Sequence, residues 1–217
     1  VYKRQGIVYC LSQKLTEQCA EFLQSEGFNA YPFHAGLDTQ VKIDTQDKFM
    51  TEDNVVVCAT IAFGMGIDKA DVRYVAHISL PSSMEAFYQE IGRAGRDGLE
   101  ADTLLIFGLQ DLFQRKRFID MSDAHDSFKI KEHKRLDALI AYCDSATCRR
   151  QTLLSYFKET CEPCGKCDNC LNPPLMIDGT EYAQMVLSAI YRTGQYFGSG
   201  HIVDVLRGVD SDKVKAK

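Results

Sequence analysis

Residues 89–98 read Gln-Glu-Ile-Gly-Arg-Ala-Gly-Arg-Asp-Gly. Arg93 and Arg96 stand three residues apart, and Gln89 precedes Arg93 by one helical turn, so the three side chains share a helical face. Glycines beside the arginines let a phosphate approach the backbone closely, and a planar guanidinium suits a multi-oxygen anion better than a lysine does. The stretch therefore indicates phosphate binding. The alternative is a helix that ends at a glycine and carries solvated arginines.

On both sides of this stretch, short apolar runs alternate with segments of helical periodicity. Strands are expected at residues 6–11, 28–33, 55–59, 74–78 and 103–107. Between the strands, Ser12, Asp38 and Ser83 are candidate N-caps of helices. This alternation predicts an α/β fold with a parallel sheet and helices on both faces.

The loops between these elements carry the candidate binding residues. In open parallel sheets, ligands bind at the carboxyl ends of the strands. We therefore expect the loops at Ser12, His34, Thr60 and Arg96 to gather at that edge of the sheet.

After residue 107 the alternation stops, and only helical patterns follow. Helices are expected at residues 109–121, 127–143 and 147–159, then a cysteine cluster, a linker at residues 172–174, and further helices from Asp178 to about Gly208. We expect an α/β domain over residues 1–108, a helical metal-binding subdomain over 109–174, and the start of another domain over 175–217.

The composition is that of an ordinary globular protein, with 217 residues, 45% hydrophobic and 25% charged. The net charge of −5 argues against a general polyanion binder, although nucleic acid responds to local patches. No apolar run approaches the roughly 20 residues of a membrane span, and there is no basic and apolar leader. Because the first residue is Val1, we expect a piece of a longer protein. An odd number of cysteines, nine, favours a reducing compartment with a metal site.

The pattern Cys164-x2-Cys167-x2-Cys170 is the most specific chemical signal in the chain. Three thiolates at this spacing can hold one zinc ion, which requires four ligands in a tetrahedron. By spacing alone, the fourth ligand is open among Cys148, Cys143 and Cys161; the alternative is a set of free thiols. The sequence therefore predicts a structural zinc site.

Half of a zinc deaminase signature is also present, as Pro163-Cys164-x2-Cys167. The other half would have to be Cys19-Ala20-Glu21, far upstream. Cys19 fits the apolar face of its helix, and a third cysteine in register exceeds the deaminase requirement, so we reject this interpretation.

Residues 59–68 form a small-residue loop, Ala-Thr-Ile-Ala-Phe-Gly-Met-Gly-Ile-Asp, directly after a buried strand. Glycines permit close backbone approach, and the hydroxyl of Thr60 can donate to a phosphate oxygen. A plain tight turn is the alternative.

Together these strings resemble the RecQ family of superfamily 2 DNA helicases. Gln-x-x-Gly-Arg-x-Gly-Arg with Ala94 and Asp97-Gly98 resembles motif VI, residues 59–68 resemble motif V, and residues 7–12 resemble motif IV. His34-Ala35-Gly36-Leu37 resembles the short motif after motif IV. The string that begins at Cys148-Arg149-Arg150 and ends at Cys170 resembles the zinc-binding subdomain, and residues 178–208 resemble the opening of the winged-helix domain.

The resemblance implies a second RecA-like lobe of an ATP-dependent helicase that moves 3′ to 5′ on single-stranded DNA. Arg96 would be the arginine finger, Arg93 a second nucleotide contact and Gln89 a coupling residue. Asp68 and Gly66 would face the nucleotide. ATP and Mg²⁺ would be bound mainly by the first RecA-like lobe, because Gly-x4-Gly-Lys-[Ser/Thr] does not occur in these residues.

The resemblance also assigns the zinc ligands as Cys148, Cys164, Cys167 and Cys170, and leaves Cys161 outside the pattern. It places Ser12, His34 and Thr60 near DNA, and Arg149 can track phosphates beside the zinc site, although a turn histidine and solvated basic helices are the alternatives. This chain has Asp44 where the family commonly carries an arginine.

The expected partners are single-stranded DNA and duplex junctions, ATP, the first lobe of the same protein and a single-stranded-DNA-binding protein, with no membrane. The expected location is the bacterial cytoplasm at the nucleoid, or the eukaryotic nucleus. The alternative function is a non-catalytic, zinc-stabilised DNA-binding scaffold.

Overall fold

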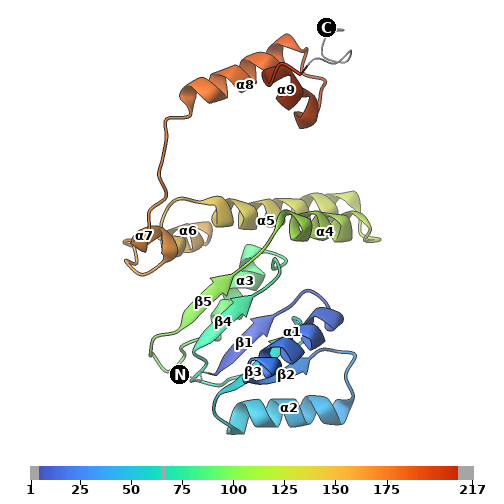
Figure 1. Ribbon diagram of the computed structural model, residues 1–217, viewed down its shortest axis with the longest axis vertical. Helices are drawn as coiled ribbons and strands as arrows, with labels where there is room; N and C mark the ends of the chain where they lie inside the picture. The colour runs from blue at the N-terminus through green and yellow to red at the C-terminus, as the bar shows by residue number, and fades with distance from the viewer. Residues whose placement is uncertain (1–4, 65–66, 210–217) are drawn as a thin grey trace. The chain divides into compact units, whose positions relative to one another are not determined.

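A computed structural model describes residues 5–64 and 67–209 (Figure 1). The chain divides into two compact units, residues 1–171 and residues 172–217. Each unit is described by itself below.

The first unit begins with a five-stranded sheet in which every pair of neighbouring strands is parallel. The strand order is β2-β3-β1-β4-β5. The strands are β1 (Gly6–Tyr9), β2 (Asn29–Phe33), β3 (Val55–Ala59), β4 (Tyr74–His77) and β5 (Asp102–Leu105). In the centre of the sheet, Val8 pairs with Cys58 on one side and with Ala76 on the other. This RecA-like arrangement confirms the predicted α/β fold.

Different helices cover the two faces of this sheet. Helix α1 (Gln13–Ser25) packs its buried Ala20 on one face, against Val8 and Val56. On the other face, α2 (Thr39–Thr51) contributes Phe49, and α3 (Met84–Ile91) is followed by the packed Ala94. As predicted, Ser12, Asp38 and Ser83 cap these helices by accepting a hydrogen bond from a first-turn backbone N–H.

Helix α3 is also the link to the helical part of the first unit. That part comprises α4 (Leu109–Asp120), α5 (Asp126–Asp144), α6 (Arg149–Tyr156) and the short α7 (Asp168–Leu171). Leu136 and Leu139 of α5, with Leu153 of α6, bury themselves against Met84 and Phe87 of α3. The helix that precedes the two arginines is therefore fixed between the sheet and the helical part.

The second unit contains α8 (Thr180–Arg192) and α9 (Ser199–Leu206). Ala189 and Ile202 are buried, one in each helix. Several large apolar side chains of the unit remain exposed, among them Tyr182, Leu187 and Tyr191. Among the described residues, no helix has the length and apolar character needed to cross a membrane.

Candidate functional site

The two arginines that follow α3 contact different parts of the loop between β3 and β4. Arg96 donates through Nη1 to Oδ1 of Asp68 at 2.6 Å and to the carbonyl of Ile67 at 3.4 Å. Its Nε also donates to the carbonyl of Gly92 at 3.3 Å. The Arg96 side chain stays 36% exposed, and that of Asp68 is 84% exposed. The pair therefore lies at the surface, where a charged ligand can reach it.

Arg93 lies deeper than Arg96. Its guanidinium is packed on Gly64, where an added Cβ would lie 2.8 Å from Nη2. Its Nε is buried and has no hydrogen-bond partner among residues 5–64 and 67–209. Burial raises the pKa of the neighbouring Tyr9 to about 12, against the opposing charge of Arg93. A side chain at position 64 would therefore displace the Arg93 guanidinium from where it now lies.

A group of hydrogen bonds, called the clasp below, joins the turn that carries the arginines (the arginine turn, residues 92–98) to residues 70–73, which lead into β4. The N–H of Gly95 donates to the carbonyl of Val72 at 2.9 Å, and that of Asp97 donates to Ala70 at 3.3 Å. Arg73 donates to both carboxylate oxygens of Asp97 at 2.6 Å. These contacts keep the pKa of the Asp97 carboxyl below its ordinary value, with the Arg73 hydrogen bond as the largest cause.

The clasp shows that our prediction of a shared edge was wrong for Arg96. Val72 and Arg73 directly precede β4, so the arginine turn lies at the amino end of that strand. The reason is topological: a crossover helix in a parallel sheet runs back against the strands, and α3 delivers its C-terminus to the opposite edge. Ser12, His34 and Thr60 do follow the carboxyl ends of β1, β2 and β3.

Gly95 provides a prediction on stability, because its φ of +67° is unfavourable for other residues. A Cβ at this position would also lie 2.9 Å from the carbonyl oxygen of Leu99. We expect Gly95→Ala to lower the free energy of unfolding by about 2–5 kcal/mol, from left-handed strain and overpacking together. Gly98 is the matched control, since its φ is +79° but nothing lies within 4 Å of an added Cβ.

For Gly98→Ala we expect only the strain, about 1–2 kcal/mol. Urea unfolding of the two variants, followed by circular dichroism, measures both values. If both variants lose the same free energy of unfolding, the close contact between a Cβ at position 95 and Leu99 does not contribute to the loss.

The residues predicted to contact DNA differ in solvent exposure and in the hydrogen bonds they already make. Ser12 is exposed, and its Oγ accepts the N–H of Leu15 as the helix cap. Thr60 is half-buried, and its backbone N–H donates to Phe33. His34 is buried, and its Nε2 lies 3.2 Å from Oε1 of Glu17. Ser12 and Thr60 are therefore open to a ligand, whereas His34 holds a neighbouring side chain.

Among the remaining predicted residues, Gln89 is exposed on α3, one turn before Arg93. Gly66 lies outside the described residues.

The four cysteines singled out by the sequence come together in the first unit. The sulfur atoms of Cys148, Cys164, Cys167 and Cys170 all lie within 4.8 Å of one another. The Cys164–Cys170 and Cys148–Cys167 sulfur pairs are each 4.0 Å apart. A tetrahedral zinc ion with Zn–S bonds of 2.3 Å requires about 3.8 Å between sulfurs, so the cluster fits zinc.

Backbone groups support this cluster in the manner expected for thiolates. The N–H of Cys164 donates to the sulfur of Cys148 at 3.2 Å, and that of Cys167 donates to Cys164 at 3.3 Å. The N–H of Arg149 donates to the sulfur of Cys167 at 3.4 Å. Cys161 lies outside the cluster, and its carbonyl accepts a hydrogen bond from Gln151. Such N–H donors stabilise negative sulfur atoms.

Arg149 supports the cysteine cluster without contributing a sulfur ligand. Its Nε and Nη2 donate to the carboxylate of Asp168 at distances down to 2.9 Å, and its Nη1 donates to the carbonyls of Tyr142 and Cys143. The guanidinium thus joins the end of α5 to α7. Sequence analysis did not predict α7 or the contact between Arg149 and Asp168, although Asp168 stands between two of the cysteines.

The first unit defines a class of protein, namely a helicase C-terminal lobe with a cysteine-rich helical part attached. Residues 2–98 match the helicase conserved C-terminal domain. Residues 109–171 match the RecQ zinc-binding family, and residues 173–217 match the RQC domain. A structural zinc site is thus supported both by the four-cysteine geometry and by the family match.

Sequence identity to individual proteins shows which family of helicases this chain belongs to. The chain is 43% identical over 212 residues to the ATP-dependent DNA helicase RecQ of Haemophilus influenzae, covering 97% of this chain and 34% of that protein. It is 39% identical over 211 residues to the Bacillus subtilis protein of the same name, covering 96% of this chain and 35% of the relative. With the RecQ-like DNA helicase BLM of Xenopus laevis it shares 45% identity over 177 residues, which cover 76% of this chain and 13% of that relative. The chain belongs to the RecQ family, and it spans about a third of the length of these bacterial relatives.

Proposed function

We propose that this chain supplies the second lobe of an ATP-dependent 3′–5′ DNA helicase, which separates strands in repair and recombination. The observation that carries the proposal is the assembly of Arg93 and Arg96 on the loop that contains Gly64 and Asp68. Relatives of 39–43% identity are named ATP-dependent DNA helicases. A lobe that completes a nucleotide site held mainly elsewhere needs an exposed arginine, here Arg96 beside Asp68, with a second arginine, Arg93, packed next to it.

In this proposal, the phosphates of ATP and its Mg²⁺ are held mainly by a first RecA-like lobe. Arg96 stabilises the negative charge that spreads over the γ-phosphate oxygens during transfer. Asp68 holds the Arg96 guanidinium at the surface until the lobes close, and its exposed carboxylate faces the nucleotide. The motif V resemblance assigns Gly66 to the nucleotide as well. Gln89, on the same face of α3, couples hydrolysis to movement.

On the DNA side, Ser12 and Thr60 are the proposed direct contacts, because they are open at the carboxyl edge of the sheet. His34 and Arg149 fit a bracing role better, since each is already engaged by a carboxylate. The proposed partners are single-stranded DNA, duplex junctions and a single-stranded-DNA-binding protein. The proposed location follows from DNA as the substrate: nucleoid or nucleus.

We also propose the ligand set Cys148, Cys164, Cys167 and Cys170, with one structural zinc per chain. The proposed domain limits are residues 1–108 for the lobe, 109–174 for the zinc-binding subdomain and 175–217 for the start of the winged helix. Because metal binding and folding are coupled in such closed thiolate sites, the zinc stabilises the helices that pack on α3.

Strand separation by the longer protein that contains this chain tests the function. We expect unwinding of a partial duplex with a 3′ single-stranded tail when ATP and Mg²⁺ are present, and none of the matched substrate with a 5′ tail. Binding of both substrates without unwinding would favour the alternative, a zinc-stabilised DNA-binding scaffold. A Gly-x4-Gly-Lys-[Ser/Thr] loop elsewhere in that protein would independently support the helicase.

A further inference from the structure

A second group of cysteines lies between α1 and the sheet. The thiol of Cys58 in β3 donates to the sulfur of Cys19 in α1, with 3.4 Å between the two sulfur atoms. Cys10, just after β1, belongs to the same buried cluster, and its thiol faces the carbonyl of Val8 at 3.8 Å. These three residues share no member with the four-cysteine zinc cluster.

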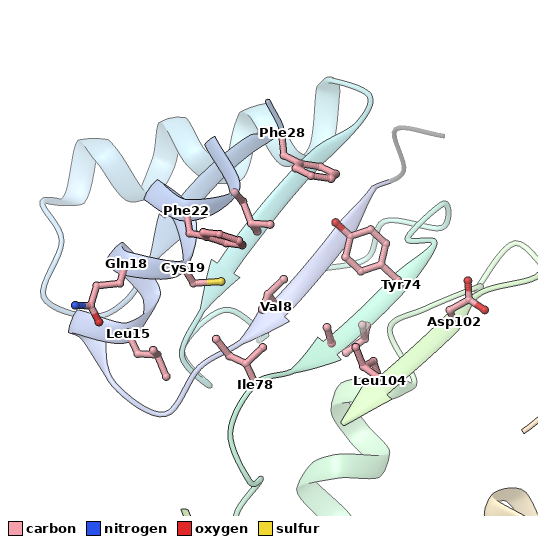
Figure 2. A pocket seen from close by; sticks show the side chains of 13 residues that line it. Val8, Leu15, Gln18, Cys19, Phe22, Phe28, Tyr74, Ile78, Asp102 and Leu104 are labelled. Atoms are coloured by element: carbon pink, nitrogen blue, oxygen red, sulfur yellow. The ribbon is translucent and has the colours of Figure 1, made fainter. Parts of the chain in front are cut away.

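The three thiols differ in their access to solvent. Cys10 and Cys58 are buried, with 6% and 0% exposure. Cys19 is half-buried and lines an open apolar groove of about 650 Å³. Figure 2 shows the groove between α1, which carries Cys19, and the strands that carry Tyr74 and Leu104. A small molecule can therefore reach Cys19, whereas Cys58 has no exposed surface and does not line the groove.

The hydrogen bonds also make Cys19 the nucleophile of the cluster. The Cys58 thiol donates to its sulfur, and the neighbouring thiols of Cys10 and Cys58 place the pKa of Cys19 below its ordinary value. The same contacts, together with burial, raise the pKa of the Cys10 and Cys58 thiols. A thiolate with an exposed approach and a neutral thiol behind it is the arrangement of a reversible oxidation site.

We propose that Cys19 and Cys58 form a reversible disulfide in response to hydrogen peroxide. The Cys19 thiolate attacks one peroxide oxygen and breaks the O–O bond, which gives a sulfenic acid on Cys19 and one water once the leaving hydroxide takes a proton. The Cys58 sulfur then attacks the Cys19 sulfur, the S–O bond breaks, and the hydroxyl leaves as a second water with the Cys58 proton. The peroxide gains two electrons, and the two sulfurs lose them.

The bond is within reach of the folded protein. A disulfide needs about 2.05 Å between sulfurs, so the pair has to approach by about 1.4 Å from its present 3.4 Å. The bond would join α1, which starts next to Ser12, to β3, which ends next to Thr60. Oxidation would thus fix the two segments that carry the proposed DNA contacts to each other.

Peptide mapping of the zinc-loaded 217-residue chain under non-reducing conditions tests the proposal. Treatment with a few equivalents of hydrogen peroxide should produce a linked Cys19–Cys58 peptide, a loss of two free thiols, and recovery of both with dithiothreitol. Cys161→Ser is the matched control and should keep the linkage, because Cys161 belongs to neither cysteine cluster. Cys58→Ser should lose the linkage and accumulate a Cys19 sulfenic acid that dimedone traps.

Since Cys58 is wholly buried, Cys19→Ser serves as a second variant if Cys58→Ser does not fold, and it should lose the linkage at unchanged circular dichroism. Three results would overturn the proposal. Cys19 could remain reduced at doses that release zinc, it could pair with Cys10 instead, or the Cys19–Cys58 peptide could be absent from the oxidised wild type.

Discussion

Replacing Arg96 by alanine in the longer protein is expected to lower DNA-stimulated ATP turnover by about 10³–10⁵-fold, the range that a transition-state arginine contributes. ATP and DNA affinities should change little, because the guanidinium gains its strongest contacts only as charge develops on the γ-phosphate. The fold should also tolerate the change. Arg96 and Asp68 form an exposed ion pair, and such pairs contribute about 1 kcal/mol or less.

Two further variants make this prediction specific. Arg117→Ala removes an exposed arginine of α4 and should leave turnover unchanged. Asp68→Asn removes the charge that holds Arg96 and should reduce turnover by less than Arg96→Ala does. Single-turnover hydrolysis, measured together with nucleotide binding, distinguishes an arginine finger from a solvated arginine at a helix end. Normal hydrolysis by Arg96→Ala would exclude Arg96 as the finger.

Loss of the zinc site is the second change for which we expect a large effect. Cys164→Ala should give a chain that holds no stoichiometric zinc and is insoluble or rapidly cleaved by protease between residues 109 and 171. The reason is that metal binding to four thiolates supplies folding free energy directly. In this region, α4 has no buried residue and α6 has only Leu153, while the two buried leucines of α5 pack against α3. The apolar core alone is therefore a poor substitute for the metal.

Cys161→Ser is the matched control, since Cys161 is close in sequence but outside the cluster. It should keep one zinc per chain and normal protease resistance. Elemental analysis and limited proteolysis of both variants, with a chelator-treated wild type beside them, test the ligand set. Zinc loss from Cys161→Ser, or full zinc retention by Cys164→Ala, would refute it.

The sequence was sufficient to predict the sheet because its strands are continuous apolar runs. Val55–Ala59 is buried at every position and was predicted with its observed limits. The strand predicted at residues 6–11 ends earlier, at Tyr9, and that at 103–107 lies at Asp102–Leu105. Strand ends are less well defined because the apolar pattern continues into the adjoining loops.

Features that depend on distant contacts were beyond sequence reasoning. Helix α7 has four residues, too few for a helical period to be seen among the cysteines. The position of Arg96 depends on the path of the loop before β4, and the clasp of Arg73 with Asp97 joins residues 24 positions apart. The proximity of Cys19 and Cys58 likewise follows from the packing of α1 on β3, which no local pattern encodes.

The central proposal is that residues 1–108 of this chain form one lobe of a two-lobe ATPase, and ATP turnover measured with single-stranded DNA tests it most directly. The 217-residue chain and the longer protein that contains it should be assayed side by side at equal concentrations. We predict DNA-stimulated turnover by the longer protein and none above background by the 217 residues alone, because they contain no Gly-x4-Gly-Lys-[Ser/Thr] loop to hold the β and γ phosphates. Helicase-like turnover by the isolated chain, or no turnover by the longer protein, would contradict the account.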